Sequence, residues 1–253
     1  LKAALSPRLW RHLPVSVEQK SLRRQLKKLV LGLNMPPEER YLNWIAIFDE
    51  GRKRGMYSED FAAKLSGAGP AIDFLLDTYR KAPHRDFVSR TTFVDMMTYL
   101  PCDLLTKVDI ASMAHSLEVR APFLDHKVVE LAVGMPMSLK MRGLKGKHIL
   151  KEAFRDLLPE EILTRSKMGF GVPISRWFRT ELSGFIRHLL LDKATISRGY
   201  FRREAVETLV EQHVSGVFDH GYRLWSLLML ELWHRTYIDA PGEEPLEGLA
   251  DLL

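Results

Sequence analysis

Residues 99–125 read Y-L-P-C-D-L-L-T-K-V-D-I-A-S-M-A-H-S-L-E-V-R-A-P-F-L-D, an apolar segment interrupted at intervals by charged side chains. Apolar and small residues recur near the spacing of a helix, at Leu104, Leu105, Val108, Ala111, Ser112 and Met113. Because residues three and four apart share one face of a helix, this spacing predicts a helix packed into the protein by that face. Pro122 then ends the segment.

Charged residues punctuate this segment and the turn after it, at Asp103, Lys107, Asp109, Glu118 and Arg120. A charge in an apolar setting must be paired, hydrogen-bonded or bound to a ligand, because an isolated buried charge is costly. One interpretation is an internal ion-pair network, for example Glu118 with Arg120 or Lys107 with Asp103. The other is the wall of a ligand site, and composition alone favours the network because structural ion pairs outnumber catalytic ones.

Three further motifs follow in order, namely Arg142-Gly-Leu-Lys-Gly-Lys-His-Ile-Leu-Lys-Glu-Ala-Phe154, Leu158-Pro-Glu-Glu-Ile162 and Lys167-Met-Gly-Phe-Gly-Val-Pro173. Together with residues 99–125, they closely resemble the ATP-using synthetase domain of the glutamine-hydrolysing asparagine synthetases. The resemblance covers about residues 96–179 and keeps the family's order of motifs, with a weaker helical likeness on either side.

The resemblance implies a mainly α fold: the helical carboxy-terminal portion of an adenine-nucleotide α-hydrolase-like (PP-loop) synthetase domain. The family's parallel sheet, glutaminase domain and Ser-Gly-Gly-x-Asp-Ser pyrophosphate loop would then lie upstream, and that loop motif does not occur in this sequence. We therefore expect residues 1–239 to form the helical portion and to be inactive alone. Residues 240–253 are acidic without a basic residue, and we expect this tail to be disordered.

The composition sets broad limits on the class of protein. A chain of 253 residues with 46% hydrophobic content can bury a full core, and no apolar run approaches the length of a bilayer span. The single cysteine, Cys102, excludes an intrachain disulfide framework and favours a reducing compartment, so we expect a cytoplasmic protein. Within its apolar run, Cys102 is predicted to be a small buried hydrophobe rather than a nucleophile.

Helix signals follow one another along the rest of the chain. The predicted helices are residues 21–33, 36–53, one capped by Ser58, one from Ile72 toward Pro83, one from Asp86, 126–133 behind Asp125, 147–158, one from Pro159, 174–178, 181–191, 203–214 and 222–237. No useful period-two alternation occurs, so we expect at most marginal strand. The basic face of helix 21–33 raises a nucleic-acid hypothesis, but a solvated face is preferred because no aromatic residues lie between its charges.

Lys147 resembles the family's synthetase-site lysine, which contacts phosphate groups and assists adenylate formation, so the resemblance implies a catalytic role. A lysine in the first helical turn after Gly146 would add a point charge to outward-facing backbone N–H groups, and both attract phosphate. The alternative is a solvated helix start, where the lysine slightly opposes the helix dipole. The five charged residues of the first segment match the family pattern as the wall of the adenylate site. The family's active-site loop is resembled by Lys167, Gly169, Phe170 and Gly171.

In the reaction of the resembled family, the carboxylate of aspartate attacks ATP to give an acyl-adenylate and pyrophosphate. Ammonia from glutamine then displaces AMP to give asparagine. The implied cofactors are ATP and Mg²⁺, with Mg²⁺ ligands mainly upstream, because the nine histidines show no clustered metal-ligand spacing and no metal site is assigned to this chain.

The implied partners are small molecules (ATP, aspartate or another carboxylate, and ammonia) and the upstream segments, without nucleic acid or membrane, and a homodimer stays open. One rival function is an amidotransferase of the same family that acts on a sugar or peptide acid, because the residues that fix the acceptor are not readable here. A rival from another class is a basic helical module that binds nucleic acid or protein. Retention on DNA with a steep salt dependence would favour that module.

Overall fold

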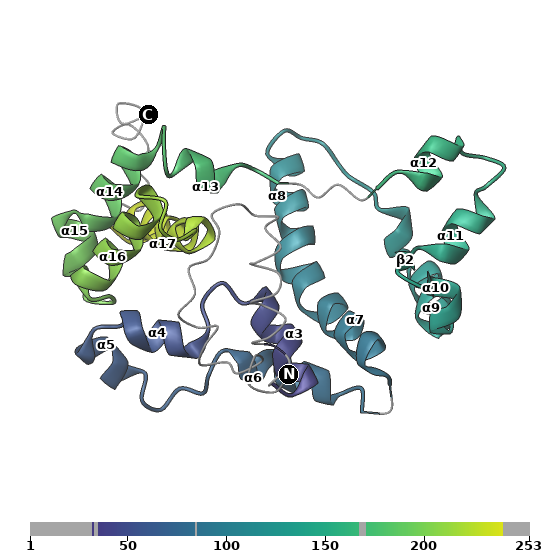
Figure 1. Cartoon of the computed structure of the whole chain (residues 1–253), viewed down its shortest axis with the longest axis horizontal. Coiled ribbons are helices and arrows are strands. Elements are labelled where there is room, and N and C mark those ends of the chain that lie inside the picture. The colour runs from purple at the N-terminus through teal and green to yellow at the C-terminus, as the bar shows by residue number, and fades with distance from the viewer. Residues whose placement is uncertain (1–31, 33–34, 84, 167–170, 240–253) are drawn as a thin grey trace. The chain divides into compact units, whose positions relative to one another are not determined.

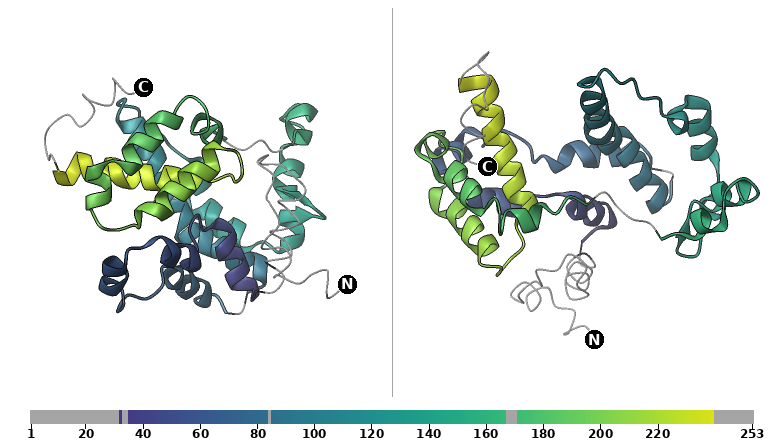
Figure 2. Two further views of the ribbon diagram at one scale, coloured as in Figure 1. Left: turned by 60° about the vertical axis from the view of Figure 1, so that its left-hand side comes forward. Right: turned by 90° about the horizontal axis from the view of Figure 1, so that it is seen from above.

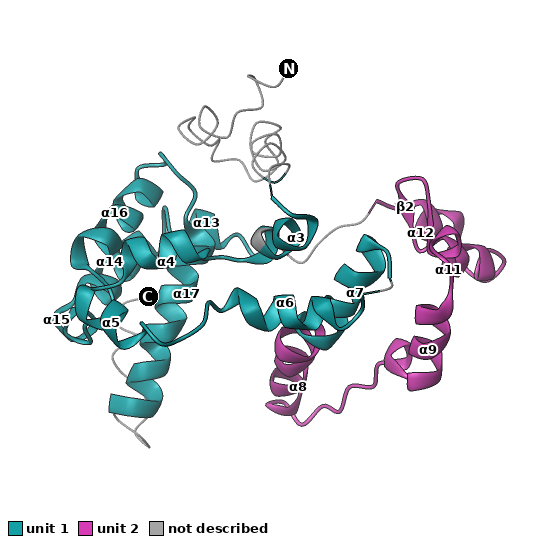
Figure 3. Ribbon diagram, turned by 90° about the horizontal axis from the view of Figure 1, so that it is seen from below, with its two compact units in different colours: residues 1–99, 172–253 teal, residues 100–171 magenta. Residues whose placement is uncertain are grey.

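The computed structural model describes residue 32 and residues 35–83, 85–166 and 171–239, most of which are helical (Figure 1). The expectation of a mainly α fold is confirmed. The chain forms two compact units, coloured separately in Figure 3. The first unit comprises Leu1–Tyr99 and Val172–Leu253, and the second comprises Leu100–Gly171.

The first unit contains helices from both ends of the chain. Its elements are α3 (Pro37–Ile45), α4 (Glu50–Met56), α5 (Glu59–Lys64), α6 (Ile72–Arg80), α7 (Phe87–Met97), α13 (Ile174–Trp177), α14 (Ser183–Leu191), α15 (Lys193–Ser197), α16 (Arg203–Val214), α17 (Gly221–His234) and the π-helical η3 (Arg235–Asp239). The predicted helix 203–214 is confirmed in full, and the predicted helices 181–191 and 222–237 are confirmed with shifted ends.

The second unit is built from short elements. They are the π-helical η1 (Leu100–Leu105), α8 (Thr106–Met113), the 3₁₀ turn η2 (Pro122–Leu124), α9 (His126–Gly134), α10 (Met137–Lys140), strands β1 (Met141–Arg142) and β2 (Lys145–Gly146), α11 (His148–Ala153) and α12 (Glu160–Thr164). The strands form a two-residue antiparallel hairpin, so the expectation of marginal strand is confirmed for the described residues. No parallel sheet occurs within them.

Polar side chains begin several helices where the sequence predicts them. Ser58 Oγ accepts a hydrogen bond from the N–H of Phe61 at 3.1 Å and so caps α5. Asp86 caps α7 in the same way, and Asp125 Oδ1 accepts from the N–H of Lys127 at 2.9 Å to cap α9. Each cap satisfies a backbone donor that the first turn of a helix leaves without an internal partner.

The predicted single helix 36–53 is wrong, because the structure divides it into α3 and α4. The chain turns extended at Ala46, where ψ is 123°, and the next helix starts after Asp49. Asp49 Oδ1 accepts a hydrogen bond from the N–H of Arg52 at 2.9 Å, which makes it an N-cap rather than a mid-helix residue. The break places Phe48 against the main core instead of on a helix face.

The main core lies among α13, α14, α16 and α17, which gather together in Figures 1 and 2. Its most deeply buried side chains are Phe178, Ile186, Leu189, Val210 and Leu224. Helix α17 is buried on one face only, because Trp225 and Trp233 remain 40% and 48% exposed. Burial of apolar surface on the inner face of α17 is the main stabilising term for this bundle.

A smaller core joins α3, α6 and α7 through Leu42, Tyr79 and Val94, all nearly inaccessible. The guanidinium carbon of Arg90 lies 3.7 Å from the centre of the Tyr79 ring, and two of its nitrogens donate to the Tyr79 carbonyl. These contacts combine a cation–π interaction with charge-assisted hydrogen bonds, and they fix α7 against the end of α6.

The segment between α4 and α5 pairs with a segment far away in sequence. The N–H of Ser58 donates to the carbonyl of Tyr200 at 3.0 Å, and the N–H of Arg202 donates to the carbonyl of Met56 at 2.8 Å. Tyr57 and Phe201 form the bridge between them, with their rings stacked at 6.1 Å. These backbone bonds tie α4 and α5 to the bundle of the main core.

The helix predicted from residues 104–113 exists, but its packing prediction is wrong for the described chain. Val108 and Met113 are 45% and 55% exposed, and Ile110 is 64% exposed. Cys102, predicted to be buried, is exposed as well. The apolar face has the spacing of a helix, but these side chains remain exposed among the described residues of the unit.

Two sequence predictions lie outside the described residues, namely the basic helix 21–33, of which only residue 32 is described, and the acidic tail 240–253. Among the helices that the structure describes, none combines the length and the apolar composition needed to cross a bilayer.

Candidate functional site

All five charged residues predicted to wall a ligand site lie in the unit 100–171. Asp103 belongs to η1, and Lys107 and Asp109 belong to α8. Glu118 and Arg120 lie in the connection between α8 and η2. Two successive stretches of backbone therefore present these side chains, one helical and one without regular secondary structure.

The predicted ion pairs are present, but they lie at the surface of the described chain. Lys107 Nζ is 3.6 Å from Asp103 Oδ1, with side chains 63% and 49% exposed. Arg120 Nη2 is 2.6 Å from Glu118 Oε1, and these side chains are 84% and 70% exposed. The prediction of pairing is confirmed, whereas the prediction of an internal network is wrong. Ion pairs as exposed as these contribute little to stability. Because the side chains are exposed, their charges are also accessible to a ligand.

A tight turn leads from α8 to Glu118 and Arg120. The N–H of Leu117 donates to the carbonyl of Ser112 at 3.0 Å, and the N–H of Ser116 donates to the carbonyl of Met113 at 2.9 Å. This pair of bonds is the Schellman motif, which requires a left-handed residue after the helix. Ser116 takes that position with φ of 56°, although glycine is the usual residue there.

Lys147 lies between β2 and α11, one residue earlier in the helix than the sequence predicts. The helix begins at His148, and Lys147 is the N-cap residue, whose carbonyl accepts a hydrogen bond from Lys151 at 3.0 Å. Its backbone is left-handed, with φ of 59° and ψ of 36°. Such a conformation is costly for a residue with a Cβ atom. The side chain of Lys147 is exposed.

The structure does not join Lys147 to the other candidate residues. Within the described part of the chain, no hydrogen bond or ion pair connects it with any of the five charged side chains. Of the predicted loop, Lys167, Gly169 and Phe170 lie outside the described residues, and Gly171 is exposed. A Cβ atom at Gly171 would meet no atom within 4 Å, so no described residue requires glycine there.

Among the residues that the structure describes, no three His, Cys, Asp or Glu side chains lie close enough together to hold a metal ion. The carboxylates of the candidate site fit a metal poorly, since Asp103 pairs with Lys107 and Glu118 pairs with Arg120. A divalent cation such as Mg²⁺ takes several oxygen ligands, so the described chain does not supply a complete set.

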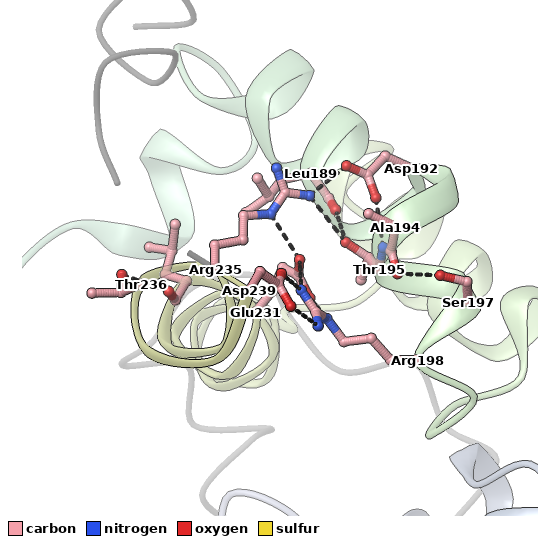
Figure 4. A network of polar contacts seen from close by, with 11 residues as sticks. Leu189, Asp192, Ala194, Thr195, Ser197, Arg198, Glu231, Arg235, Thr236 and Asp239 are labelled. Carbon is pink, nitrogen blue, oxygen red and sulfur yellow. Dashed lines mark hydrogen bonds and ion pairs between the residues drawn. The ribbon is translucent and has the colours of Figure 1, made fainter. Parts of the chain in front are cut away.

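Sequence reasoning did not predict the buried ionic network of the first unit, which Figure 4 shows from close by. Glu231 is 2% exposed and accepts hydrogen bonds from Arg198 at 2.6 and 2.9 Å and from Arg235 at 2.7 Å. Arg235 also pairs with Asp192, and Arg198 also pairs with Asp239. Burial alone would raise the pKa of Glu231, but the two guanidinium groups outweigh it and hold that pKa below its usual value.

A second buried polar cluster surrounds His213, which is fully buried. Its Nε2 donates to the carbonyl of Ser175 at 3.0 Å, and its Nδ1 accepts from the N–H of His220 at 3.0 Å. Asp219 Oδ1 accepts from Ser175 Oγ at 2.8 Å and from the N–H of Gly221 at 3.2 Å. The two bonds of His213 require a neutral ring, and burial, with a smaller effect of Arg179, lowers its pKa.

Most partners in the two clusters carry no local sequence signal. Arg198 and Glu231 are 33 positions apart, and Ser175 and His213 are 38 positions apart. The local signals are that Glu231 interrupts an apolar run, and so needs a partner, and that Arg235 follows it four residues later. Both clusters connect helices of the first unit to one another, so we interpret them as structural.

Comparison with known proteins identifies the family. A family model described as asparagine synthase matches residues 2–235. "Asparagine synthetase [glutamine-hydrolyzing] 1" of Bacillus subtilis is 30% identical over 208 residues, which cover 81% of this chain and 31% of that protein. A "Putative asparagine synthetase [glutamine-hydrolyzing]" of Mycobacterium bovis is 32% identical over 217 residues, covering 84% and 32%.

The asparagine synthetase of Rattus norvegicus is 32% identical over 144 residues, covering 53% of this chain and 25% of that protein. No solved structure matches the chain. The chain spans about a third of the length of the two bacterial relatives. The resemblance inferred from residues 99–173 is confirmed, since the family model extends over all of its motifs, and this chain belongs to the asparagine synthase family.

Proposed function

We propose that this protein forms asparagine from aspartate, ATP and glutamine-derived ammonia, and that residues 100–171 supply part of its synthetase site. The observation that carries the proposal is the match of the asparagine synthase model to residues 2–235. The names of the curated relatives, which describe asparagine synthetases that hydrolyse glutamine, support the same substrates here. The glutaminase segment and the pyrophosphate loop would come from outside this chain.

The proposed reaction has two steps. In the first, an oxygen of the aspartate side-chain carboxylate bonds to the α-phosphorus of ATP, the bond to the bridging oxygen breaks, and pyrophosphate leaves. In the second, the nitrogen of ammonia bonds to the acyl carbon, the acyl–oxygen bond breaks, and AMP leaves with that electron pair while a base takes a proton. Negative charge grows on the departing groups in both steps, so placed cations lower the barrier.

We assign to Lys147 the stabilisation of the departing pyrophosphate. Its exposed ammonium is accessible to a phosphate, and its left-handed backbone supports a functional role. A residue with a Cβ atom in that conformation costs about 1 to 3 kcal/mol, and residues of this kind cluster at active sites. The left-handed backbone sets the direction of the Cα–Cβ bond of Lys147 at the junction between the hairpin and α11.

We assign to the two exposed ion pairs the role of contacting and orienting substrate at the wall of the synthetase site. Arg120 pairs with Glu118 through one nitrogen, which leaves other donors of its planar fork for a substrate carboxylate or phosphate. Lys107 and Asp103 form a looser pair at 3.6 Å, and Asp109 lies on α8 with Lys107. When substrate binds, these side chains would release their partners within the protein and pair with the substrate. This change of partner would orient the substrate.

ATP enters this proposal as substrate, and Mg²⁺ bound with it would supply positive charge that offsets the charge of the phosphates. The described residues lack a complete Mg²⁺ ligand set, so the remaining protein ligands would lie outside this chain. A cytoplasmic location and a homodimer remain parts of the proposal, the location being supported by the single cysteine of the sequence.

The proposal is tested by pyrophosphate exchange in the full-length protein. Radiolabelled pyrophosphate should enter ATP only when aspartate is present, because exchange reports reversible formation of the acyl-adenylate. Added glutamine should then give asparagine, AMP and pyrophosphate in equal amounts. Exchange that depends on a different carboxylate, or that does not occur with aspartate, would overturn the proposal.

A further inference from the structure

The outer face of α17 carries a row of large uncharged side chains that extends into η3. The two elements follow one another directly and are drawn in yellow in Figure 2. Five residues form this outer stripe, each between 40% and 63% exposed, namely Tyr222, Trp225, Met229, Trp233 and Tyr237. Residues three and four apart share one face of a helix, so these side chains follow one line along the surface.

Helix α17 is therefore apolar on two faces. Its inner face packs into the main core through Leu224, Leu227 and Leu228. On the outer side, every exposed residue between positions 222 and 237 is uncharged. The charged Glu231 and Arg235 of this segment bind one another within the protein. A helix that is hydrophobic all round is typical of a buried helix, so the outer stripe predicts a partner that covers it.

Neighbouring rings hold the tryptophans of the outer stripe in position. The ring of Trp225 stacks on that of buried Phe178, with centroids 6.3 Å apart. The ring of Trp233 lies 5.0 Å from that of His234 and 6.2 Å from that of Tyr237. Side chains held in this way lose less conformational entropy when a partner binds. The cores of protein interfaces are enriched in Tyr, Trp and Met and depleted in charge, which matches the stripe.

The order of residues in the outer stripe is nearly palindromic about Met229. Trp225 and Trp233 lie four residues on either side of it, and Tyr222 and Tyr237 lie seven and eight residues from it. Two copies of this stripe match when their helices run antiparallel, because tryptophan then meets tryptophan and tyrosine meets tyrosine. A two-fold symmetric interface requires such self-complementarity. The stripe also brings no like charges together across the axis.

The exposed area of the outer stripe suits the core of an interface between two subunits. An aromatic side chain buries about 150 to 250 Å², so four rings at about half exposure offer on the order of 400 Å². Each partner in a standard interface contributes roughly 800 Å², of which the rings would supply about half. Met229 and the neighbouring Leu230, both exposed, add to this area.

We propose that two copies of this protein pair through the outer stripe, with their α17 helices antiparallel about a two-fold axis near Met229. Trp225 then packs against the partner subunit's Trp233, and Tyr222 packs against the partner subunit's Tyr237. The homodimer is part of the proposed function, and the stripe gives it a surface. None of the five residues has a part in the proposed reaction, so the interface and the reaction can be tested separately.

Sedimentation equilibrium of the full-length protein measures the pairing. The parent protein should be a dimer. Met229→Glu and Met229→Lys should each weaken dimerisation roughly tenfold or more, because a charge near the two-fold axis faces the same charge on the other copy. A one-to-one mixture of the two variants should restore the dimer, because opposite charges then meet at the axis.

The matched control is Phe74→Glu, which places a charge at an exposed apolar position of α6 in the same unit. It should dimerise as the parent protein does. A dimer that persists in Met229→Glu, or a mixture that stays monomeric, would overturn the proposal. So would a monomeric parent protein, whether upstream segments of its own chain cover the stripe or the stripe binds phosphatidylcholine vesicles in a flotation assay.

Cross-linking locates the axis without a charged substitution. Cys102 is exposed, so Cys102→Ser is the background. In it, Met229→Cys places two thiols close together across the axis, and a short bis-maleimide should join residue 229 of one copy to residue 229 of the other, as mapped by mass spectrometry of peptides. Phe74→Cys in the same background should give no such link between copies. A dimer without the link at residue 229 would contradict the proposed axis.

Pyrophosphate exchange that depends on aspartate is measured on the same preparations. A dimer that pairs through the stripe but gives no exchange would count against the proposed function alone. Normal exchange in a protein that does not pair through the stripe would count against the interface alone.

Discussion

Ser116 and Lys147 are the described residues other than glycine that have a positive φ. Each lies at the end of a regular element: Ser116 closes α8, and Lys147 opens α11. Both positions belong to the motifs on which the family resemblance rests. A left-handed residue redirects the backbone sharply, so these two positions determine where Glu118, Arg120 and the lysine itself are presented.

The cost of the left-handed turn at Ser116 can be measured. Ser116→Gly should raise the free energy of unfolding by roughly 0.5 to 1 kcal/mol, because glycine has no Cβ penalty at positive φ. Ser112→Gly, in the last turn of α8, is the matched control and should lower it by about 0.5 kcal/mol. Urea denaturation measures both. A destabilised Ser116→Gly variant would show that the serine side chain, rather than the turn, stabilises the segment.

Buried His213 and half-buried His220 predict a specific dependence of stability on pH. The pKa values of His213 and His220 lie below their ordinary value, that of His220 at about 4. Below about pH 6.5 the unfolded chain takes up protons that the folded chain excludes, so the free energy of unfolding should fall from there toward pH 4. The stability that is lost on acidification should be fully retained above pH 7.

Urea denaturation at pH 7.5, 6.0 and 5.0 tests this pH dependence. His220→Gln retains hydrogen-bonding groups for Arg223 and Gln212 but does not titrate, so its stability should vary less with pH. His115→Gln, at an exposed position, should keep the slope of the parent protein. The same slope in all three proteins would show that these buried rings do not control acid sensitivity.

At the scale of elements, the contact between α13 and α17 depends on a glycine. A Cβ atom placed on Gly221 would lie 2.2 Å from Ser175 Oγ and 2.9 Å from Ser175 Cα. The second distance involves backbone, which cannot rotate away as a side chain can. The two helices therefore approach closely only because residue 221 has no side chain.

Gly221→Ala should destabilise the protein by about 1 to 3 kcal/mol, because the overlap forces the two helices apart. The control is Gly184→Ala in α14, where a Cβ atom would meet nothing within 4 Å. That exchange should stabilise the protein by about 0.5 to 1 kcal/mol through helix propensity. Thermal unfolding of the two variants gives the comparison. Equal changes in stability for Gly221→Ala and Gly184→Ala would rule out the close contact with Ser175 as the cause of destabilisation.

The elements that the sequence predicts well are those set by local chemistry. Ser58, Asp86 and Asp125 cap helices through hydrogen bonds within three residues, which spacing alone reveals. The break within residues 36–53 was missed because distant contacts set it: the Ile47 carbonyl binds Arg223, and the neighbouring Phe48 packs on the main core. Local propensity cannot report contacts of that range.

The candidate site shows the same division between local and distant information. The pairs Glu118 with Arg120 and Lys107 with Asp103 were predictable because their partners are two and four residues apart. The left-handed backbone of Lys147 was not predictable from the sequence, because lysine does not favour a positive φ. The family motifs supplied its functional assignment, which spacing could not.

At the scale of the whole molecule, the unit 100–171 exposes large apolar side chains. The most exposed examples are Leu144 at 100%, Leu157 at 73%, Phe123 at 65% and Leu131 at 64%. No residue of the described part of this unit belongs to either core cluster. We expect the parallel sheet of the family's synthetase domain to cover this surface in the full-length protein.

The 253-residue chain on its own should therefore associate as its concentration rises. Light scattering coupled to size-exclusion chromatography measures this association. Leu144→Glu with Leu157→Glu should reduce it, because charge on the exposed surface opposes contact between copies. Val217→Glu, at an exposed position of the other unit, is the control and should not. If the chain stayed monomeric at all concentrations and unfolded in a sharp transition, the claim that its exposed apolar surface drives association would be wrong.

The assignment of Lys147 to the synthetase site is tested most directly by comparing three variants of the full-length protein. Lys147→Ala removes the ammonium, Lys147→Gly removes it and also relieves the left-handed backbone, and Lys145→Ala removes a neighbouring exposed lysine of the hairpin. Asparagine formation, ATP binding and glutamine hydrolysis are measured for each, together with the melting temperature.

Both Lys147 variants should form asparagine about a hundred- to a thousandfold more slowly, the usual effect of removing one preorganised charge-stabilising group. ATP binding should change little, and glutamine hydrolysis should continue, because the ammonium acts on charge that develops in the transition state. Lys145→Ala should keep the normal rate. Near-normal asparagine formation in Lys147→Ala, with only a lower melting temperature, would contradict the assignment and make Lys147 a structural residue.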